Sequence, residues 1–265
     1  MTEKRSYDYK DYWIEVTVQE AGGRFEGIAT IFVSRDSAWS GGAPAHRVLT
    51  GGSTESDADS AAATRLDSPQ GVAVDNTHHE LVVSNDGRLS ILVFDRLADG
   101  NVAPLREIFG SNTLITTPEG LVVDPVHNEI ILADEGDPEA SPVIPPKLLV
   151  FDRTANGNVA PKRVITGLST GLIRPRQLQL DTERDELVLA DRGLPQEFVF
   201  TPATQGYIGF WERTASGDTP PKRVIRGPRS QLSSPRAVYV DIENDEIGAG
   251  DTTSRARRLE SLHHD

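Results

Sequence analysis

The sequence predicts an all-β protein, a β-propeller of four-stranded blades, because two repeats interleave along it and helical periodicity is nearly absent. The first repeat runs from a proline, through an alternating apolar strand, to an aspartate. It occurs four times, at residues 68–75, 117–124, 174–181 and 234–241. The closing aspartates are successively 49, 57 and 60 residues apart. Spacings of this size are typical of propeller blades, each of which needs its neighbours to bury both faces.

A second repeat lies between copies of the first. It consists of an aromatic residue, an acidic residue and arginine, then Ala-x-Gly, and finally Arg-x-Ile-x-Gly. Complete copies occupy residues 94–110, 151–167 and 211–227, and a degenerate copy occupies 33–51. Ten residues after each closing aspartate of the first repeat, an amide or carboxylate side chain ends a short apolar run. These markers are Asn85, Asp134, Asp191 and Asp251.

Each unit divides into four short strands. The first is the alternating run before the aspartate, as in Val72 and Val74, and a polar turn such as 76–79 leads into the second. The second strand ends at the marker, and the third is an apolar run such as 90–94. A Gly/Asn/Pro turn then leads to the fourth strand, the Arg-x-Ile-x-Gly element. The best helix candidate, residues 57–66, falls in a connection.

The two ends of the chain affect the predicted number of blades. A pair of outer strands (28–51) precedes the first inner pair, and the last inner pair (235–251) has no outer pair after it. We therefore expect the ring to be closed by N-terminal strands pairing with the C-terminal blade, which removes open sheet edges. An extra alternating strand at 12–19 makes the count four or five blades. The predicted organisation is one propeller domain over 1–265, with an extra strand region at 1–27 and a polar tail at 252–265.

The pattern Pro-x-Gly-Val-Ala-Val-Asp followed by Val-Phe-Asp-Arg, seen at 69–75 and 93–96, resembles the NHL-repeat propellers of bacteria. This resemblance covers about residues 30–251, and the neighbouring superfamily, to which the chain is distantly similar, holds the gluconolactonase, paraoxonase and strictosidine-synthase-like enzymes. The resemblance implies a propeller architecture and says less about activity, because function resides in sites carried by a fold. NHL propellers usually have six blades, so this chain departs from them in blade number.

Composition excludes several classes of function. The 265 residues include 40 acidic and 27 basic side chains, which gives a formal net charge of −13 and disfavours nucleic acid or anionic membranes as partners. The absence of cysteine excludes disulfides, thiolate zinc sites and cysteine nucleophiles. No apolar run reaches the ~18 residues of a membrane span. The N-terminus as given lacks the apolar region of a secretory signal, so cytoplasmic localisation is the default expectation.

The longest connections are expected on one face, around the mouth of the central channel. They are residues 135–146, 192–206 and 52–67, and loops elaborated on one face of a rigid scaffold usually carry binding. The residue that follows the proline of the first repeat is also expected there and differs between copies. These four residues are the ligand-binding candidates: Gln70, Glu119, Arg176 and Arg236. The two arginines suit an anionic substrate, and the alternative is ion pairing with nearby acidic residues.

The markers converge on the same face. Their oxygen atoms suit Ca²⁺, which takes ~6–8 oxygen ligands. In the gluconolactonase-like enzymes, a glutamate near the start of a first strand and Asn or Asp from other blades hold the metal. The resemblance implies a Ca²⁺ site at Glu119, Asn85, Asp134 and Asp191, although arginine occupies two of the four positions equivalent to Glu119. The alternative is structural, with each marker capping backbone N–H groups of its own loop.

Other repeated residues are predicted to be structural. The closing aspartates precede a polar turn in all four copies: Asp75, Asp124, Asp181 and Asp241. The histidines His78, His79 and His127 lie in those turns, at the end opposite the channel mouth. The arginine of Phe-Asp-Arg is expected beside an acidic residue of a neighbouring blade. The sequence contains no Gly-x-Ser-x-Gly motif and no phosphate-binding glycine loop.

We therefore predict a non-catalytic propeller scaffold that binds a protein or a small ligand through its long-loop face. One alternative is a Ca²⁺-dependent hydrolase or lactonase in which a metal-bound water is the nucleophile. Another is a truncated propeller that acts through assembly as a homo-oligomer. The sequence leaves open whether the protein is an enzyme and which ligand it takes.

Overall fold

The computed structural model describes residues 65–194 and 205–252, together with the backbone of five strands nearer the two ends of the chain. Its strands form five antiparallel sheets, in each of which the strands pair in chain order. The first sheet joins β1 (Glu3–Tyr9), β2 (Tyr12–Ala21), β3 (Arg24–Phe32) and β4 (Arg47–Thr50). The second joins β5 (Pro69–Asp75), β6 (Glu80–Asn85), β7 (Ser90–Asp95) and β8 (Arg106–Phe109).

The remaining three sheets follow the same plan. The third joins β9 (Pro118–Asp124), β10 (Glu129–Asp134), β11 (Lys147–Asp152) and β12 (Arg163–Ile165). The fourth joins β13 (Pro175–Asp181), β14 (Glu186–Gly193), β15 (Gln205–Glu212) and β16 (Arg223–Ile225). The fifth has three strands, β17 (Pro235–Asp241), β18 (Glu246–Asp251) and β19 (Glu260–His263).

Helical structure is minor in the part of the chain that the structure describes. It consists of three 3₁₀ turns, η1 (Asp86–Arg88), η2 (Ser111–Thr113) and η3 (Leu168–Thr170). None of the described helical segments has the length and apolar character needed to cross a membrane. The helix candidate at 57–66 lies largely outside the described residues.

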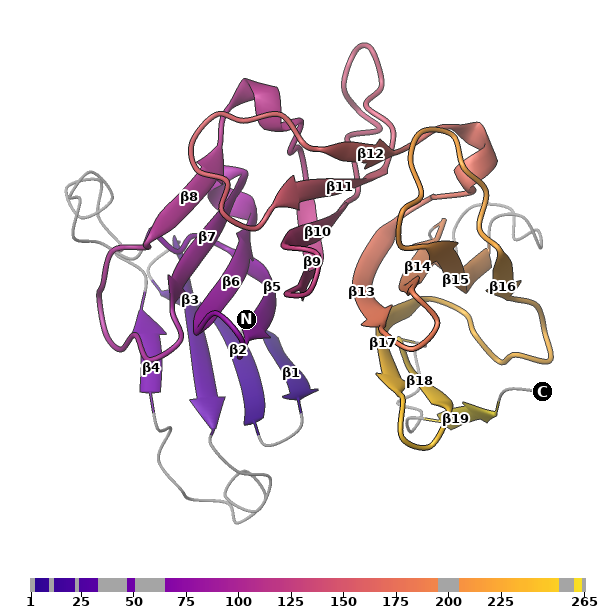
Figure 1. Ribbon diagram of the computed structural model, residues 1–265, viewed down its shortest axis with the longest axis horizontal. Coiled ribbons are helices and arrows are strands. Elements are labelled where there is room, and N and C mark those ends of the chain that lie inside the picture. The colour runs from indigo at the N-terminus through magenta and orange to yellow at the C-terminus, as the bar shows by residue number, and fades with distance from the viewer. Residues whose placement is uncertain are drawn as a thin grey trace.

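Successive sheets follow one another like propeller blades, as Figure 1 shows for β5 to β19. The first strands are neighbours in space, because β5 contacts β9, β9 contacts β13, and β13 contacts β17. The later strands of each sheet lie progressively farther from this inner row (Figure 1). The predicted all-β class and the four-stranded blade are therefore confirmed.

One expectation about the chain ends needs correction. The N-terminal strands do not complete the C-terminal blade among the described strands, because β1 to β4 pair with one another in a four-stranded sheet of their own. Sequence reasoning missed β1 because its residues are mostly polar. Within the polar tail, β19 pairs with β18. Backbone hydrogen bonds suffice for an edge strand even where the side chains are polar.

The hydrophobic core lies between adjacent sheets. Val93 and Ile108 of the second sheet pack in one cluster with Leu132 and Phe151 of the third, and all four side chains are fully buried. A second cluster joins the third and fourth sheets, and it includes Trp211. A middle strand such as β10 is therefore covered on both faces, which explains its uninterrupted apolar run.

Glycine in the first strands permits close packing of the inner row. A Cβ atom on Gly120 would lie 2.7 Å from the backbone of Arg176 and Gln177 in β13. A Cβ atom on Gly71 would lie 2.8 Å from the Cα of Gly120 in β9. Real Cβ atoms do not approach backbone atoms so closely. The glycine of the Pro-x-Gly pattern in β5 and β9 is therefore required by the close contact between neighbouring blades.

The second repeat docks each blade on the one before it. Gly157, in the turn before β12, donates to the carbonyl of Glu107 in β8 at 2.6 Å and accepts from the Phe109 amide at 3.2 Å. Gly217, in the next blade, makes the same pair of contacts with Val164 and Thr166 at 2.7 and 3.1 Å. The Ala-x-Gly element is therefore a joint between blades rather than a free turn.

Buried glutamates open the second strands of three sheets. The arginine of the fourth strand reaches the glutamate within the same sheet: Arg106 binds Glu80 at 2.8 and 2.9 Å, Arg163 binds Glu129 at 2.6 and 2.8 Å, and Arg223 binds Glu186 at 3.2 Å. Bidentate pairing of this kind is strong and sets the relative geometry of the two groups.

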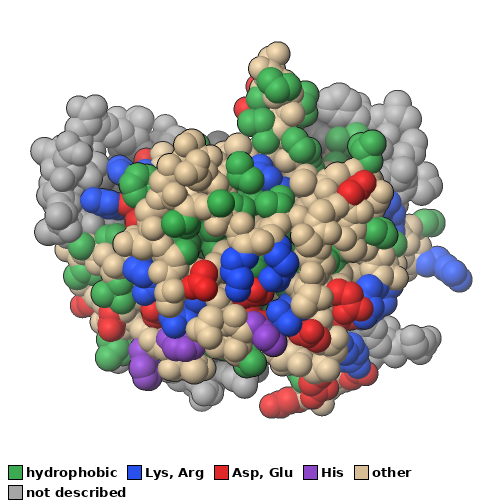
Figure 2. Space-filling model, turned by 45° about the horizontal axis from the view of Figure 1, so that its top comes forward, with side chains coloured by type: hydrophobic (Ala, Val, Ile, Leu, Met, Phe, Trp, Pro, Cys, Tyr) green, Lys and Arg blue, Asp and Glu red, His purple; other side chains and the backbone are tan. Residues whose placement is uncertain are grey.

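The arginine of Phe-Asp-Arg adds a contact from the following blade. Arg153 reaches Glu80 at 2.7 Å, and Arg213 reaches Glu129 at 3.4 Å. The predicted pairing of this arginine with an acid of a neighbouring blade is therefore present. Figure 2 shows basic and acidic side chains interspersed in a band across one face of the molecule, with histidines beside them. Ion pairs thus join successive blades.

We predict that Gly120→Ala destabilises the fold by about 1–3 kcal/mol, because the new methyl group would overlap the β13 backbone. Gly248→Ala is the matched control, since its Cβ would meet only the Tyr239 Cβ at an ordinary 3.8 Å. Urea unfolding should show a lower free energy for the first variant and a change within about 0.5 kcal/mol for the second. Equal effects would contradict the close approach of the inner strands.

The Glu129 pairs predict a specific pH dependence. Hydrogen bonds from Arg163 lower the Glu129 pKa from 4.5 to about 2, and Lys162 adds to the effect. Because the folded-state pKa is depressed, this stabilisation, at most about 3 kcal/mol, is complete above about pH 5 and lost as the pH falls toward 2.

Glu129→Gln should therefore lower the free energy of unfolding at pH 7 and flatten its decline between about pH 5 and 2, as measured by urea titration. The control is Glu183→Gln, an exposed residue of the β13–β14 turn. An unchanged acid decline in Glu129→Gln would show that other carboxylates cause it.

Candidate functional site

The first strands begin, and the second strands end, at the same end of each sheet. The register pairs each repeat proline with the marker of the same sheet: Pro69 with Asn85, Pro118 with Asp134, Pro175 with Asp191, and Pro235 with Asp251. The candidate residue after each proline therefore lies beside that marker. We call this end of the inner strands, at the starts of β5, β9, β13 and β17, the mouth.

The markers hold the backbone that leads into the first strands. Asp134 accepts hydrogen bonds from the amides of Thr116 and Thr117 at 2.7 and 3.1 Å, and from Gly136 in the following loop at 3.0 Å. Equivalent bonds join Asn85 to the Asp67 amide, Asp191 to the Ile173, Arg174 and Gly193 amides, and Asp251 to the Ser233 and Ser234 amides. The markers therefore cap backbone N–H groups, as the structural alternative predicted. They cap groups in the segment before the first strand as well as in their own loops.

Two of the markers are carboxylates buried without any exposure. Asp134 also accepts from the Nζ of Lys147 at 2.8 Å, so its charge is balanced. Burial raises the pKa of Asp191, and hydrogen bonds from backbone amides oppose that rise. A metal ion at either carboxylate would have to replace these bonds. Within the described ranges, no three or more Asp, Glu and His side chains form a group suited to hold a metal ion.

Glu119 and Arg176 meet across neighbouring blades. Arg176, in β13, forms ion pairs with Glu119 of β9 and with Glu135, which directly follows β10. Arg174 extends this chain, since its Nε lies 2.5 Å from the Glu135 carboxylate. Glu119 is only 6% exposed, so its carboxylate is largely committed to arginine. The structure thus brings two of the four candidates together as an ion pair.

Gln70 and Arg236 occupy the equivalent positions of β5 and β17, and both are half-buried. Arg236 belongs to a group of arginines around Arg192, whose Nε lies 3.5 Å from the Oγ of Ser234. Burial, followed by the charges of Arg176, Arg236 and Arg174, lowers the pKa of Arg192 to about 10. The mouth is therefore basic over β13, β14 and β17.

Sequence reasoning missed a second series of variable positions. The residue directly after each marker also differs between blades: Asp86, Glu135, Arg192 and Thr252. Burial raises the pKa of Asp86, and the negative charges of Asp134 and Asp67 add to the effect. The mouth is thus acidic over β5 and β6 and basic over the later blades. An alignment of the repeat copies would have shown this variation, one position after the markers.

One long connection forms a finger beside the mouth. Between β10 and β11, Asp137 and Ile144 exchange two backbone hydrogen bonds at 2.8 and 3.0 Å. The hairpin projects from the top of the molecule in Figure 1, and its Val143 side chain is 62% exposed. The other two predicted loops fall mostly outside the described residues, at 195–204 and 51–64.

The opposite end of the inner strands is occupied by turns. Asp75 accepts from the amides of Thr77 and His78 at 2.9 and 3.0 Å, and the His78 Nδ1 lies 2.7 Å from its other oxygen. The same bonds recur at Asp124 with Val126 and His127. These aspartates therefore shape their own turns, which is the structural role predicted for them.

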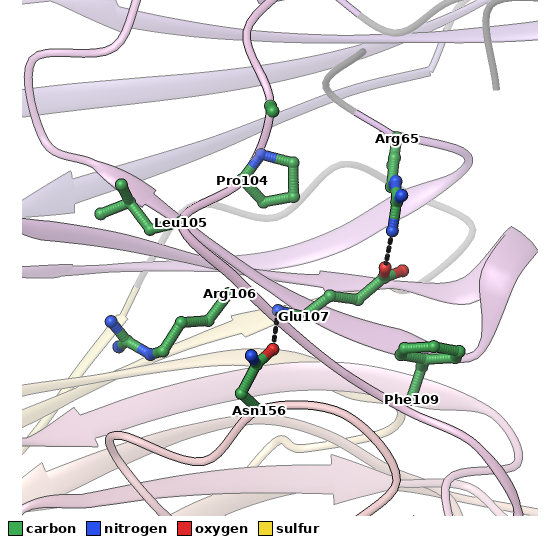
Figure 3. A pocket seen from close by; sticks show the side chains of 8 residues that line it. Arg65, Pro104, Leu105, Arg106, Glu107, Phe109 and Asn156 are labelled. Carbon is green, nitrogen blue, oxygen red and sulfur yellow. Dashed lines mark hydrogen bonds and ion pairs between the residues drawn. The ribbon is translucent and has the colours of Figure 1, made fainter. Parts of the chain in front are cut away.

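A shallow pocket of about 170 Å³ lies away from the mouth, along β8. Figure 3 shows Arg65 reaching the Glu107 carboxylate and Asn156 accepting from the Glu107 backbone amide, at 2.5 and 3.1 Å. Leu105 and Phe109 add exposed apolar surface. The pocket lies where the turn containing Asn156 docks on the preceding blade, so its contacts belong to the joint between blades.

Comparison with known proteins identifies the fold. No protein-family model matches the sequence, and no curated protein matches it. Among solved structures, the chain resembles hydrazine synthase of Kuenenia stuttgartiensis (TM-score 0.54, 15% identity), covering 89% of this chain and 51% of that one. It thus spans about half the length of the synthase chain.

Two further structures are similar. One is a nidogen/laminin complex, with a TM-score of 0.53 and 16% identity over 96% of this chain and 76% of that chain. The other is the β-propeller domain of Cps50 (Swd1) from Myceliophteria thermophila, with a TM-score of 0.51 and 11% identity over 95% and 68%. At such identities the likeness concerns the fold alone, and that fold is a β-propeller.

We predict that Ca²⁺ does not stabilise the protein through the markers, because their oxygen atoms already accept hydrogen bonds from the backbone. Thermal unfolding with Ca²⁺ up to about 10 mM should move Tm by less than about 1 °C. A saturable rise in Tm that disappears in Glu119→Gln would instead establish the metal site that the enzyme resemblance implies.

Proposed function

We propose that the protein is a non-catalytic propeller scaffold of the NHL-repeat type that binds a ligand at the mouth. The repeat pattern at 69–75 and 93–96 supports the NHL type. The propeller fold supplies a rigid frame, and the loops at one end of such a frame are a usual place for binding. The ligand is a small molecule or a protein segment that reaches the mouth.

The observation that carries this proposal is the contrast between the two ends of the inner strands. At the turn end, the aspartates are the same in every copy of the repeat, and Asp75 and Asp124 have the same turn hydrogen bonds. At the mouth, equivalent positions carry an amide in β5, a carboxylate in β9 and guanidinium groups in β13 and β17. Variation at equivalent positions on one scaffold is expected where a ligand is contacted and unnecessary where only the fold is maintained.

The chemistry of the mouth favours binding over hydrolysis. Glu119 is the residue to which the enzyme resemblance assigns the role of metal ligand, and its carboxylate is ion-paired with Arg176. The described histidines His78, His79 and His127 lie in turns at the opposite end of the strands. The groups present at the mouth are charged and partly desolvated, which suits recognition of a polar ligand.

A thermal-shift panel of acidic, basic and neutral small molecules tests this proposal. At least one chemical class should raise Tm, by about 5 °C at saturation, because it binds the folded state only. Gln70→Ala and Glu119→Gln, both at the mouth, should weaken that shift. The control Glu183→Gln, at the opposite end of the strands, should leave it unchanged. Stabilisation that is insensitive to both mouth variants would place binding elsewhere and contradict the proposal.

A further inference from the structure

Four arginines gather at one side of the mouth. Arg174 directly precedes β13, Arg176 lies in β13, Arg192 lies near the end of β14, and Arg236 lies in β17. All four are half-buried, and the charges of the other three act on Arg192. This is a local excess of positive charge in a chain whose formal net charge is −13.

The nearby carboxylates Glu119 and Glu135 form ion pairs with some of these arginines and not with Arg192. Glu119 pairs with Arg176, and Glu135 pairs with Arg176 and Arg174. Within the described ranges no carboxylate lies at ion-pair distance from Arg192, and its side chain has only the Ser234 hydroxyl, at 3.5 Å. Among the described residues, Arg192 is therefore partly desolvated and not ion-paired, and the Glu135 carboxylate acts on its charge only from beyond ion-pair distance.

A half-buried cation beside other cations is unfavourable unless an anion is nearby. Arginine presents a planar set of N–H donors that matches the oxygens of a carboxylate or phosphate. The backbone around Arg192 is held in place, because its amide donates to the Arg174 carbonyl at 3.1 Å and the amide of Ser234 donates to Asp251. The donors are thus carried by ordered strand ends rather than by a free loop.

We propose that the group around Arg192, with Arg236 and the Ser234 hydroxyl, binds the single anionic group of a small ligand, a carboxylate or a phosphate monoester. The inference rests on the proposed function, since it assigns the ligand class of the same mouth. The anion balances the charge of Arg192 and accepts hydrogen bonds from its guanidinium.

The opposite side of the mouth limits the ligand further. Asp86 and Asp67 lie over the second blade, and Asp86 is within electrostatic reach of Arg176 and Glu135. A second negative group extending toward β5 would meet these carboxylates, whereas a neutral or cationic group would not. The preferred ligand therefore carries one anionic end and a neutral or basic remainder.

Inorganic phosphate serves as the probe of the anion site, with sodium chloride at equal ionic strength as the reference. We expect saturable binding of phosphate by isothermal titration calorimetry. Arg192→Gln should weaken it about tenfold, and Arg192→Lys, which keeps the charge, should weaken it less. The control Arg184→Gln removes an arginine from a turn at the opposite end of the strands and should leave the affinity unchanged.

The stability of the variants without phosphate separates binding from a structural role. If Arg192 only supports the fold, Arg192→Gln should lower Tm, which would contradict the inference. If it awaits an anion, the variant should keep or raise Tm, because an uncompensated charge has been removed. Non-saturable binding, or equal affinities in Arg192→Gln and Arg184→Gln, would also overturn the anion site.

The outcome is distinguishable from that of the wider proposal. A neutral or purely basic compound that stabilises the protein in a way sensitive to Gln70→Ala, with no phosphate binding, would keep the mouth as a binding site and reject its anionic ligand class. Absence of any mouth-sensitive binding would reject both proposals.

Discussion

Adjacent blades are held together by buried glutamates that are shared between arginines of two adjacent sheets. Glu80 is held by Arg106 of its own sheet and by Arg153 of the next, and Glu129 is held in the same way by Arg163 and Arg213. A desolvated carboxylate is costly unless its partners are in place, and the arginine of the next blade adds to the stabilisation that each glutamate receives within its own sheet. Hydrogen bonds from Gly157 and Gly217 add a backbone joint next to each of these pairs. Together, these contacts fix the distance between the inner strands of adjacent blades along the whole row.

That spacing gives the two ends of the inner strands different roles. At the turn end, the side chain of a repeated aspartate is consumed by its own turn, as at Asp124. At the mouth, the side chains of the markers likewise accept hydrogen bonds from backbone amides, as at Asp134. The residues next to the markers differ from blade to blade. The scaffold therefore presents a set of variable side chains on fixed positions. The resulting surface is polarised, with Asp86 on one side and Arg192 on the other.

The structural neighbours share the propeller fold of this chain. They are proteins described in quite different terms, a hydrazine synthase, a nidogen/laminin complex and a Cps50 propeller domain, and they share 11–16% identity with this chain. Interiors of stacked four-stranded sheets require only apolar runs, close strand contacts and turn residues, and many sequences supply them. The charged residues of the mouth are not needed for such packing. Their arrangement is the part of the molecule on which the proposed ligand binding rests.

Local pattern was sufficient for the frame. The alternation that ends at Asp75, the Pro-x-Gly pattern at Gly120 and the Phe-Asp-Arg trio are short-range features, so their repetition along the chain predicts strands, turns and blades. The polar strand β1 and the edge strand β19 could not be predicted in this way, because backbone pairing, rather than side-chain pattern, forms them. The site depended on the tertiary structure for a related reason. Glu119 could be a metal ligand or an ion-pair partner until β13 placed Arg176 beside it, and Arg192 became notable only when β17 and β13 brought further arginines near it. Charge interactions between blades act over distances in space, and these distances are set by how the sheets stack.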